Sequence, residues 1–382
     1  MTSHNQSEQP HILFLFSDTG GGHRSAADAI IEAITLEYPG KITAEMVDIF
    51  REYAPPPLDM APEIYPPLSR MPDIWKLGYR ISNGRRRTSF FNNMFWPYIY
   101  RASRRLVRDH PSDLIVSIHP LTNTPVRRSI SEYGIPFVTV VTDMVSTHAF
   151  WYDNHADLVI VPTIAAQMRG LQIGMSIDRI KVVGMPVADR FCQPAGDRID
   201  LKKKLGWSQE LPVVILVGGG EGMGPLQETA MAIDAARLPI ELVVICGRNQ
   251  KLKARLDNHA WQIPSNIYGF VKDMPDFMRA AEILVTKAGP GTISEAFIAG
   301  LPIILYSRMP GQEDGNVTYA VGEGAGIWAP KPDMVVHALS NWLNNPEERV
   351  QAVEACHRLA APNASREIAR TLAAFIGLSE TH

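Results

Sequence analysis

The chain has 382 residues, which is too long for one ordinary hydrophobic core and predicts two domains of about 150 to 200 residues each. Hydrophobic residues make up 46% of the sequence and charged residues 20%, as in globular proteins, and a formal net charge of −3 gives no overall attraction to nucleic acid. The three cysteines lie far apart without a CxxC pair, which argues against a zinc ribbon or a disulfide framework and indicates a reducing compartment.

Short apolar and β-branched runs alternate with amphipathic segments, which is typical of α/β layers with mostly parallel sheets. In the first half of the chain, strands are predicted at 12–16, 43–47, 114–118, 137–141, 158–161 and 180–183. A second series starts with LPVVILVGGGEGMG and continues through IELVVICG, SNIYGFV and AEILVTKAGPGTISEAFIAG to LPIILY.

Each series opens with a strand that runs into a Gly-rich turn, LFLFSDTGGGH in the first and VILVGGGEGMG in the second. Doubly wound sheets bind ligands beyond the carboxyl ends of their strands. The pattern therefore predicts an α/β fold of two Rossmann-like doubly wound domains that face a central cleft.

The predicted domain boundaries follow changes in composition. We expect a disordered N-terminus over 1–10, an N-terminal domain over 11–190, a linker over 191–211 and a C-terminal domain over 212–345. Residues 346–382 are expected to form helices that pack back across the domain junction. The first ten residues lack the apolar region of a signal peptide, and no apolar run approaches the roughly 18 to 20 residues of a membrane-spanning helix, so we expect a cytoplasmic protein.

The stretch SDTGGGHRSAADAI, at 17–30, marks a strand-to-helix junction. Such a junction favours anions, because the first amides of a helix have no internal partners. The stretch lacks the Lys-Ser/Thr of a P-loop, and its glycines are contiguous, unlike GxGxxG. A plain nucleotide cradle of either type, and with it a nicotinamide dehydrogenase, is therefore disfavoured.

Together with GGGEGMGP, ICGRN and TKAGPGTISEAFIAGLPIILYSRMPGQEDGN, this stretch resembles the monogalactosyldiacylglycerol synthases and their bacterial relatives. These are inverting GT-B glycosyltransferases akin to the peptidoglycan enzyme that adds N-acetylglucosamine to lipid I. The resemblance implies that the C-terminal domain binds the UDP-sugar and the N-terminal domain binds the acceptor. It implies no metal or other cofactor, and the sequence has no DxD motif at a strand end.

The donor site is assigned from this resemblance and from the Gly-rich turns. A turn ahead of a helix near Gly291 would hold the diphosphate, Glu295 would accept from both ribose hydroxyls, and Gln312 with Glu313 would contact the sugar. For Arg248, phosphate contact and a surface ion pair are almost equal alternatives. The predicted donor-binding residues are Gly218, Gly219, Gly220, Glu221, Arg248, Phe270, Val271, Gly289, Pro290, Gly291, Thr292, Glu295, Gln312, Glu313 and Asn316.

The predicted catalytic base is His23, which follows Gly20, Gly21 and Gly22 at the first Gly-rich turn. An imidazole accepts a proton near neutral pH, and we expect the helix terminus to lower its pKa and keep it neutral. Asp143 is the second choice, with Asp18 as a further rival, and either could instead orient the imidazole. His119 and His148 are interpreted as hydrogen-bonded loop histidines.

The segment from Arg70 to His110 carries ten Arg and Lys residues against two Asp, interleaved with aromatic residues. This composition suits a membrane interface, where rings lie at headgroup depth and cations meet anionic lipid. A nucleic-acid surface would use the same residue types but has no supporting motif, and some rings are expected in the core. The predicted mobile membrane-facing lobe contains Arg85, Arg86, Arg87 and some of Phe90, Phe91, Phe95 and Trp96.

The resemblance implies an enzyme that transfers a hexose from a UDP-sugar to diacylglycerol with inversion, and together with the basic and aromatic segment it leads us to expect this enzyme at the inner face of the membrane. UDP-galactose is the typical donor of the family, and UDP-glucose is the alternative. Competing hypotheses are a UDP-N-acetylglucosamine transferase or 2-epimerase of the same fold, and a non-catalytic sugar-nucleotide or lipid sensor.

Overall fold

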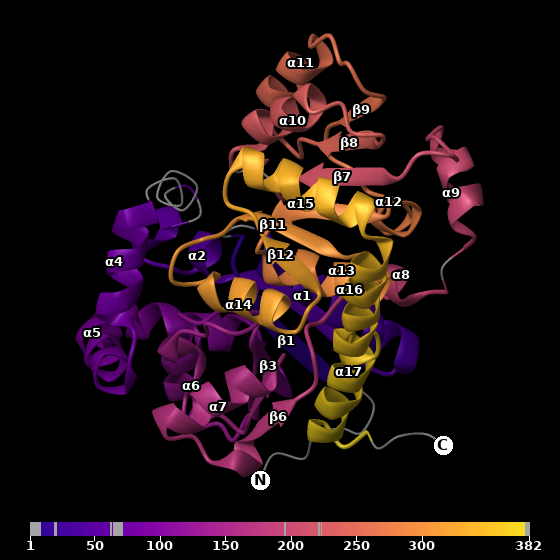
Figure 1. The fold of residues 1–382 in the computed structure, drawn as a ribbon. Helices are drawn as coiled ribbons and strands as arrows, with labels where there is room; N and C mark the ends of the chain where they lie inside the picture. The colour runs from indigo at the N-terminus through magenta and orange to yellow at the C-terminus, as the bar shows by residue number, and fades with distance from the viewer. Residues whose placement is uncertain are drawn as a thin grey trace. The chain divides into compact units, whose positions relative to one another are not determined.

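The computed structural model describes residues 9–18, 21–61, 63, 72–194, 196–220, 222 and 224–378. The chain divides into two compact units. Unit 1 comprises Met1–Asp189, Pro310–Gln312 and Asn363–His382, and unit 2 comprises Arg190–Met309 and Glu313–Pro362. Each unit contains a six-stranded sheet in which every pair of neighbours is parallel, so the predicted α/β class is confirmed (Figure 1).

The strands of unit 1 lie within one residue of their predicted positions. They are β1 (His11–Phe16), β2 (Thr43–Asp48), β3 (Leu114–Ser117), β4 (Phe137–Val140), β5 (Leu158–Val161) and β6 (Ile180–Val182), in the sheet order β2-β1-β3-β4-β5-β6. Most are short runs of apolar residues because helices cover both faces of a parallel sheet.

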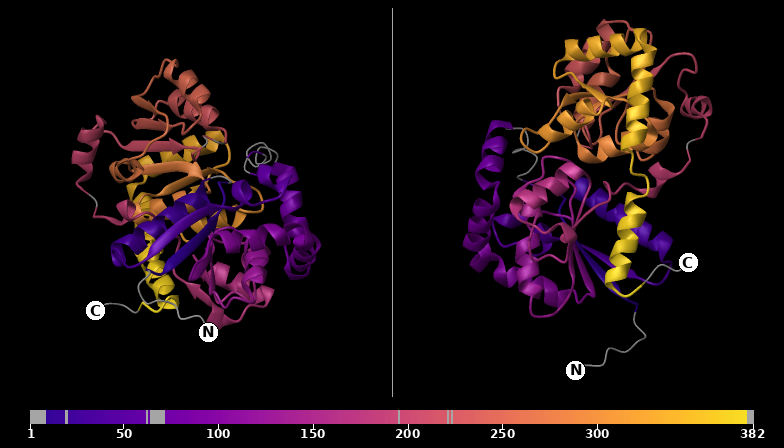
Figure 2. Two further views of the ribbon diagram at one scale, coloured as in Figure 1. Left: turned by 180° about the vertical axis from the view of Figure 1, so that it is seen from behind. Right: turned by 60° about the horizontal axis from the view of Figure 1, so that its bottom comes forward.

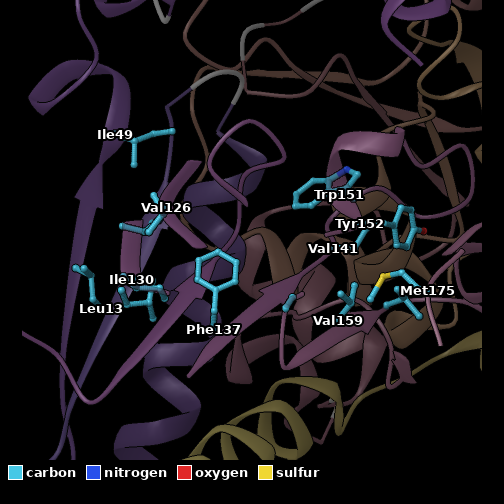
Figure 3. Close-up of a cluster of buried hydrophobic side chains, with 14 of the residues drawn as sticks. Leu13, Ile49, Val126, Ile130, Phe137, Val141, Trp151, Tyr152, Val159 and Met175 are labelled. Carbon is cyan, nitrogen blue, oxygen red and sulfur yellow. The ribbon is translucent and has the colours of Figure 1, made fainter. Parts of the chain in front are cut away.

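Successive side chains along each strand point to opposite faces of the sheet, so they pack into two separate hydrophobic cores. The helices of unit 1 are α1 (Gly22–Glu37), α2 (Ile49–Glu52), α4 (Pro72–Ser82), α5 (Arg85–Asp109), α6 (Asn123–Ile130), α7 (Ile164–Ile173) and α17 (Ala364–Phe375), with short 3-10 turns η1 (Leu58–Met60), η2 (Ala149–Trp151) and η3 (Ile177–Arg179). On one face Leu13 and Phe137 pack with α2, α5, α6 and α7 (Figure 3). On the other face Ile12 packs with α1 and α17, and the right-hand view in Figure 2 shows helices on both sides of this sheet.

Unit 2 repeats this architecture. Its strands are β7 (Val213–Val217), β8 (Glu241–Ile245), β9 (Ser265–Tyr268), β10 (Ile283–Lys287), β11 (Ile303–Ser307) and β12 (Gly326–Trp328), in the order β12-β11-β10-β7-β8-β9. Its helices are α9 (Arg198–Leu205), α10 (Leu226–Ala235), α11 (Gln250–Asp257), α12 (Met274–Ala280), α13 (Pro290–Ala299), α14 (Asp314–Gly322), α15 (Pro332–Asn344) and α16 (Pro346–Leu359), and α8 (Asp189–Cys192) lies where the units divide.

Two segments outside the predicted sheets have well-defined places. The segment interpreted as a linker, 191–211, contains α9, which packs on α12 and belongs to unit 2. The last two helices belong to different units. Helix α16 is part of unit 2, whereas α17 packs against α1 in unit 1. The Ser365 hydroxyl donates to the Val187 carbonyl, and Arg366 pairs with Asp189, so α17 is fixed to its unit by polar contacts as well as by its apolar face.

The strand order creates one switch point in each sheet. In unit 1 the chain leaves β1 toward β2 and then returns to the other side of β1 as β3, so the loops after β1 and β3 diverge. In unit 2 the same reversal falls between β7 and β10. Ligands of open α/β sheets bind in the crevice outside such points.

Among the residues that the structure describes, the helices include none that is both long and apolar enough to cross a bilayer.

Candidate functional site

His23 lies at the switch point of unit 1. It occupies the first turn of α1, directly after Gly21, whose φ of 77° is left-handed and favours glycine. The imidazole Nδ1 lies 2.9 Å from the Thr142 hydroxyl, which follows β4. Residues that follow β1 and β4 thus meet around this ring.

Two further rings enclose His23. The His119 ring lies edge-on to it, with 4.9 Å between ring centroids, and the Trp151 ring lies 5.9 Å away. His119 follows β3, the other strand of the switch point. It was interpreted as a loop histidine, and its Nδ1 does accept from the Leu121 amide at 3.4 Å, but its ring forms one wall around the predicted base.

The pKa of His23 falls from 6.5 to about 4, chiefly because burial disfavours the charged imidazolium, while a hydrogen bond with the Ile118 carbonyl acts in the opposite direction. Burial likewise lowers the pKa of His119, with His23 adding to the effect. The pKa of His23 is therefore lowered as expected, and burial is the largest cause. The imidazole is neutral at pH 7 and, when its N–H donates to Ile118, its other nitrogen is an acceptor.

The two carboxylates that rivalled His23 have other partners. Asp143 accepts from the Trp151 indole at 2.7 Å and from the Gln312 amide at 2.9 Å. Asp18 forms two hydrogen bonds with the Arg24 guanidinium, at 2.6 and 2.9 Å. Both carboxylates are therefore engaged by other side chains, and Thr142 takes the position beside the imidazole that we considered for an aspartate.

His148 has the hydrogen bonds expected of a structural loop histidine. Its Nδ1 accepts from the Phe150 amide at 3.1 Å and its Nε2 lies 3.1 Å from the Ser82 hydroxyl. Burial lowers its pKa to about 4.

In unit 2 the Gly-rich turn after β7 packs against the turn after β8. A Cβ on Gly247 would collide with the Gly220 carbonyl, and the Arg248 amide donates to that same carbonyl at 2.8 Å. The Arg248 guanidinium lies over the exposed Phe270 ring, 5.1 Å from its centroid. Arg248 thus borders Gly220 and Phe270, two other residues that are predicted to bind the donor.

Lys287 ends β10 and lies between the Gly-rich turn after β7 and the Gly-rich turn before α13. It was not among the residues predicted from the sequence. Cβ atoms placed on Gly219 and Gly289 would lie 3.2 Å from its Cε and 3.1 Å from its Nζ. The ammonium forms an ion pair of 2.7 Å with the buried Glu313 carboxylate. The available signal was a lysine directly before AGPG, where a strand ends at an anion-binding turn.

The next turn leads into α13. Gly289 is its N-cap and has no side-chain cap bond, and Pro290 takes the first helical position, so the terminal amides of Gly291 and Thr292 have no capping side chain from Gly289. One turn further, burial raises the pKa of Glu295 to about 7, and Arg190 opposes this shift.

The loop after β11 contributes two buried polar side chains. Glu313 accepts from the Met309 amide at 2.7 Å in addition to its pair with Lys287. The Asn316 amide group donates to the Ala288 carbonyl at 2.9 Å, and its buried Oδ1 has no hydrogen-bond partner among the described residues. Gln312 groups with unit 1, and the half-buried Val271 follows Phe270.

Of the other predicted site residues, Gly20 and Glu221 fall outside the described residues. Gly22 begins α1, and Gly218 follows β7. Arg85, Arg86 and Arg87 are exposed at the start of α5, as is Phe90, which is 62% exposed, while Phe91 and Trp96 are half-buried. These positions leave the membrane and donor assignments as predictions.

Structural comparison identifies the fold. MurG of Acinetobacter baumannii superposes with a TM-score of 0.62 at 15% identity, covering 95% of this chain and 99% of that one. Anabaena Alr3699/HepE in complex with UDP-glucose gives a TM-score of 0.56 at 15% identity, covering 95% and 99%. The two Rossmann-like units therefore have the GT-B fold.

Sequence comparison identifies the family. Residues 23–187 match the family Monogalactosyldiacylglycerol (MGDG) synthase, and residues 213–368 match the glycosyltransferase family 28 C-terminal domain. A probable chloroplastic monogalactosyldiacylglycerol synthase of Nicotiana tabacum is 36% identical over 374 residues, 94% of this chain and 70% of the relative. Monogalactosyldiacylglycerol synthase 1 of Arabidopsis thaliana is 34% identical over 367 residues, 92% and 68%. The chain belongs to the monogalactosyldiacylglycerol synthase family.

Proposed function

We propose that this glycosyltransferase moves galactose from UDP-galactose to the free hydroxyl of diacylglycerol, with inversion, at a membrane surface. Family membership supports the lipid acceptor and the hexose. The observation that carries the chemistry is His23, a neutral imidazole at the switch point of unit 1. A neutral imidazole accepts a proton from an alcohol, which is the step that an inverting transfer requires of its base.

In the proposed reaction the acceptor oxygen attacks the anomeric carbon as the bond from that carbon to the β-phosphate oxygen breaks. The hydroxyl proton passes to His23, and UDP leaves with its electron pair. In unit 2, Lys287, Arg248 and the amides at the start of α13 surround the position proposed for the diphosphate, where they would stabilise the negative charge of the leaving group. We propose that these groups replace a metal ion in this role.

A donor panel tests the proposal. The protein is incubated with diacylglycerol in anionic vesicles and UDP-galactose, UDP-glucose or UDP-N-acetylglucosamine, and the lipids are separated by chromatography. We expect a galactolipid, in an amount that a chelator does not reduce. We expect less glycolipid from UDP-glucose than from UDP-galactose. UDP binding without any glycolipid would favour the non-catalytic sensor and overturn the proposal.

The anomer of the product is the second readout. Nuclear magnetic resonance of the purified lipid should show a β-glycosidic bond, since the donor is an α-glycoside and a single displacement inverts it. An α-linked product would contradict the single-displacement mechanism even if galactose is transferred.

A further inference from the structure

Unit 1 contains an apolar cavity of about 310 Å³ beneath α5, in the size range of small-molecule sites. Helix α5 contributes one stripe of its surface, at intervals of three and four residues, and α2, α6 and η2 close the other sides. The lining residues that carry the argument are Phe50, Phe91, Phe95, Ile99, Ala102 and Leu121.

Three polar side chains of the lining form hydrogen bonds with residues outside it. The Asn92 amide donates to the Thr124 hydroxyl at 3.1 Å, and the Thr122 hydroxyl donates to the His119 carbonyl at 2.6 Å. The Ser82 hydroxyl donates to the Gly78 carbonyl at 2.9 Å. An occupant of this cavity therefore meets hydrocarbon and aromatic surface and has few groups to bond, which suits an alkyl chain and disfavours a sugar or a nucleotide.

The cavity reaches the molecular surface at an apolar patch. Phe95 lines the cavity and is nevertheless 43% exposed, and Leu121 lines it while 47% exposed. Phe90, Met94 and Tyr98 continue the exposed apolar surface along α5. A chain that leaves a bilayer at this patch can enter the cavity past Phe95 without crossing water, so the hydrophobic cost of the transfer is small.

The inner end of the cavity lies next to the candidate base. Phe50 lines the cavity, and its ring lies edge-on to His119 with 5.3 Å between centroids. His119 in turn lies edge-on to His23. Thus one edge-to-face series of rings, Phe50 and His119, connects the wall of the cavity with the imidazole of His23.

We propose that this cavity binds one acyl chain of the diacylglycerol acceptor and thereby positions the free glycerol hydroxyl at His23. This inference rests on the proposed function for the identity of the acceptor. The proposal places one chain in this cavity, which residues of α2, α5, α6 and η2 line, and the second chain stays with the bilayer.

Photo-crosslinking locates the chain directly. Wild-type protein is bound to vesicles that contain a diacylglycerol with a diazirine in one acyl chain, irradiated and digested, and the labelled peptides are identified by mass spectrometry. We expect labels within 91–106 and 121–126. Labels confined to other segments, or equal labelling by a phosphatidylcholine with the same diazirine chain, would overturn the inference.

Filling the cavity tests its role in catalysis. Ala102→Phe places a ring in the cavity, and Ala102→Ser is the matched control that keeps it open. We expect Ala102→Phe to lower kcat/KM for dioleoylglycerol by about tenfold or more, a loss of about 1.4 kcal/mol, and to change that for dioctanoylglycerol far less. Equal effects on both acceptors, or none, would contradict an acyl site.

The outcomes separate the two proposals. Ile99→Trp fills the cavity from a half-buried position on the same stripe, and UDP affinity with thermal unfolding shows that each variant is folded. If wild-type protein transfers no hexose to either acceptor, the proposed function fails, and the crosslinks alone decide whether the cavity holds an acyl chain. If transfer is normal in Ala102→Phe, the cavity inference fails while the function stands.

Discussion

The imidazole of His23 is held by its hydrogen bond with Thr142 and by the rings of His119 and Trp151. Replacing His23 with Ala should lower kcat by about a hundredfold to ten-thousandfold, the usual contribution of a general base, and leave UDP affinity within a few fold. Thr142→Val keeps the volume and removes the orienting hydroxyl, so a smaller loss is expected. Steady-state kinetics with isothermal titration of UDP measures both, and activity that survives in His23→Ala would show that the base is another residue.

Because burial lowers the pKa of His23 to about 4, the base is already deprotonated over the physiological range. The acid limb of kcat/KM, which reports the free enzyme, should therefore lie near that value and well below the 6.5 of an ordinary histidine. A limb near 6.5 that is absent from His23→Ala would mean that the imidazole is solvated in the working enzyme.

The Lys287 ammonium lies between the two Gly-rich turns and pairs with Glu313. If it binds the diphosphate, Lys287→Met should weaken UDP about tenfold to a hundredfold, the range of a charge-assisted hydrogen bond, and leave uridine binding unchanged. The matched control is Arg308→Met, because it removes a cation that pairs with Asp314, the residue after Glu313. An equal loss for UDP and uridine would assign Lys287 to the structure of the loop.

Burial raises the pKa of Glu295 to about 7, so this carboxyl group titrates near neutral pH. The same group is predicted to accept hydrogen bonds from the ribose hydroxyls. The ionised carboxylate is the better acceptor, and binding that favours it strengthens as pH rises through the pKa. Uridine, which has no titrating phosphate, should bind more tightly at pH 8 than at pH 6, by up to about tenfold for a shift of one unit. Glu295→Gln should remove this pH dependence, and an identical dependence in wild type and variant would place Glu295 away from the ribose.

At the scale of elements, the strands were predictable, and the contacts between the loops that follow them were not. Most strands of unit 1 are short runs of mainly apolar residues, and such runs carry a signal within the local sequence. The contact of His119 with His23 depends on the strand order, because only the reversal at β1 brings the loops after β1 and β3 to one switch point. No local pattern encodes that order.

The walls of the apolar cavity in unit 1 could not be predicted from the local sequence either. Its walls come from α2, α5, α6 and η2, which are separated by tens of residues, and the aromatic residues of α5 divide between wall and surface. The sequence predicted that some rings would be buried and others exposed, but their distribution depends on packing partners far along the chain. Lys287 was missed because a lysine that ends a strand resembles an ordinary solvated terminus.

His148 connects two elements, since it binds the Phe150 amide of η2 and the Ser82 hydroxyl at the end of α4. Its pKa is about 4 in the folded protein, against 6.5 when unfolded, so the unfolded chain binds the proton first. Stability is therefore complete above pH 6.5 and declines as pH falls toward 4, by up to about 3 kcal/mol from this residue. Urea unfolding at pH 7.5 and pH 5 should show this decline, and His148→Gln should reduce it.

The control for this prediction is His155→Gln, at an exposed position of the same unit. It should leave the pH dependence of the unfolding free energy unchanged. If His148→Gln also leaves it unchanged, His148 is not the group that links proton binding to folding, and His23 and His119 are the next candidates.

At the scale of the whole molecule, the net charge is −3, so attraction to an anionic membrane must come from a local surface. Arg85–Arg87 begin α5, exposed and next to Phe90, while Ile74, Leu77 and Ile81 expose an apolar stripe on α4. Cations and apolar side chains side by side are the two contributions that interfacial binding needs.

Replacing Arg85–Arg87 with serine should weaken binding to anionic vesicles about a hundredfold at low salt, since each arginine contributes about 1 kcal/mol near such a surface. The loss should shrink as salt rises, because the Debye length falls to about 10 Å at 0.1 M. The matched control replaces Lys203, Lys251 and Arg255, three exposed cations of unit 2, with serine and should bind nearly as the wild type does. Vesicle flotation measures both, and an equal loss in the two variants would mean that total charge, and not the start of α5, governs the attraction.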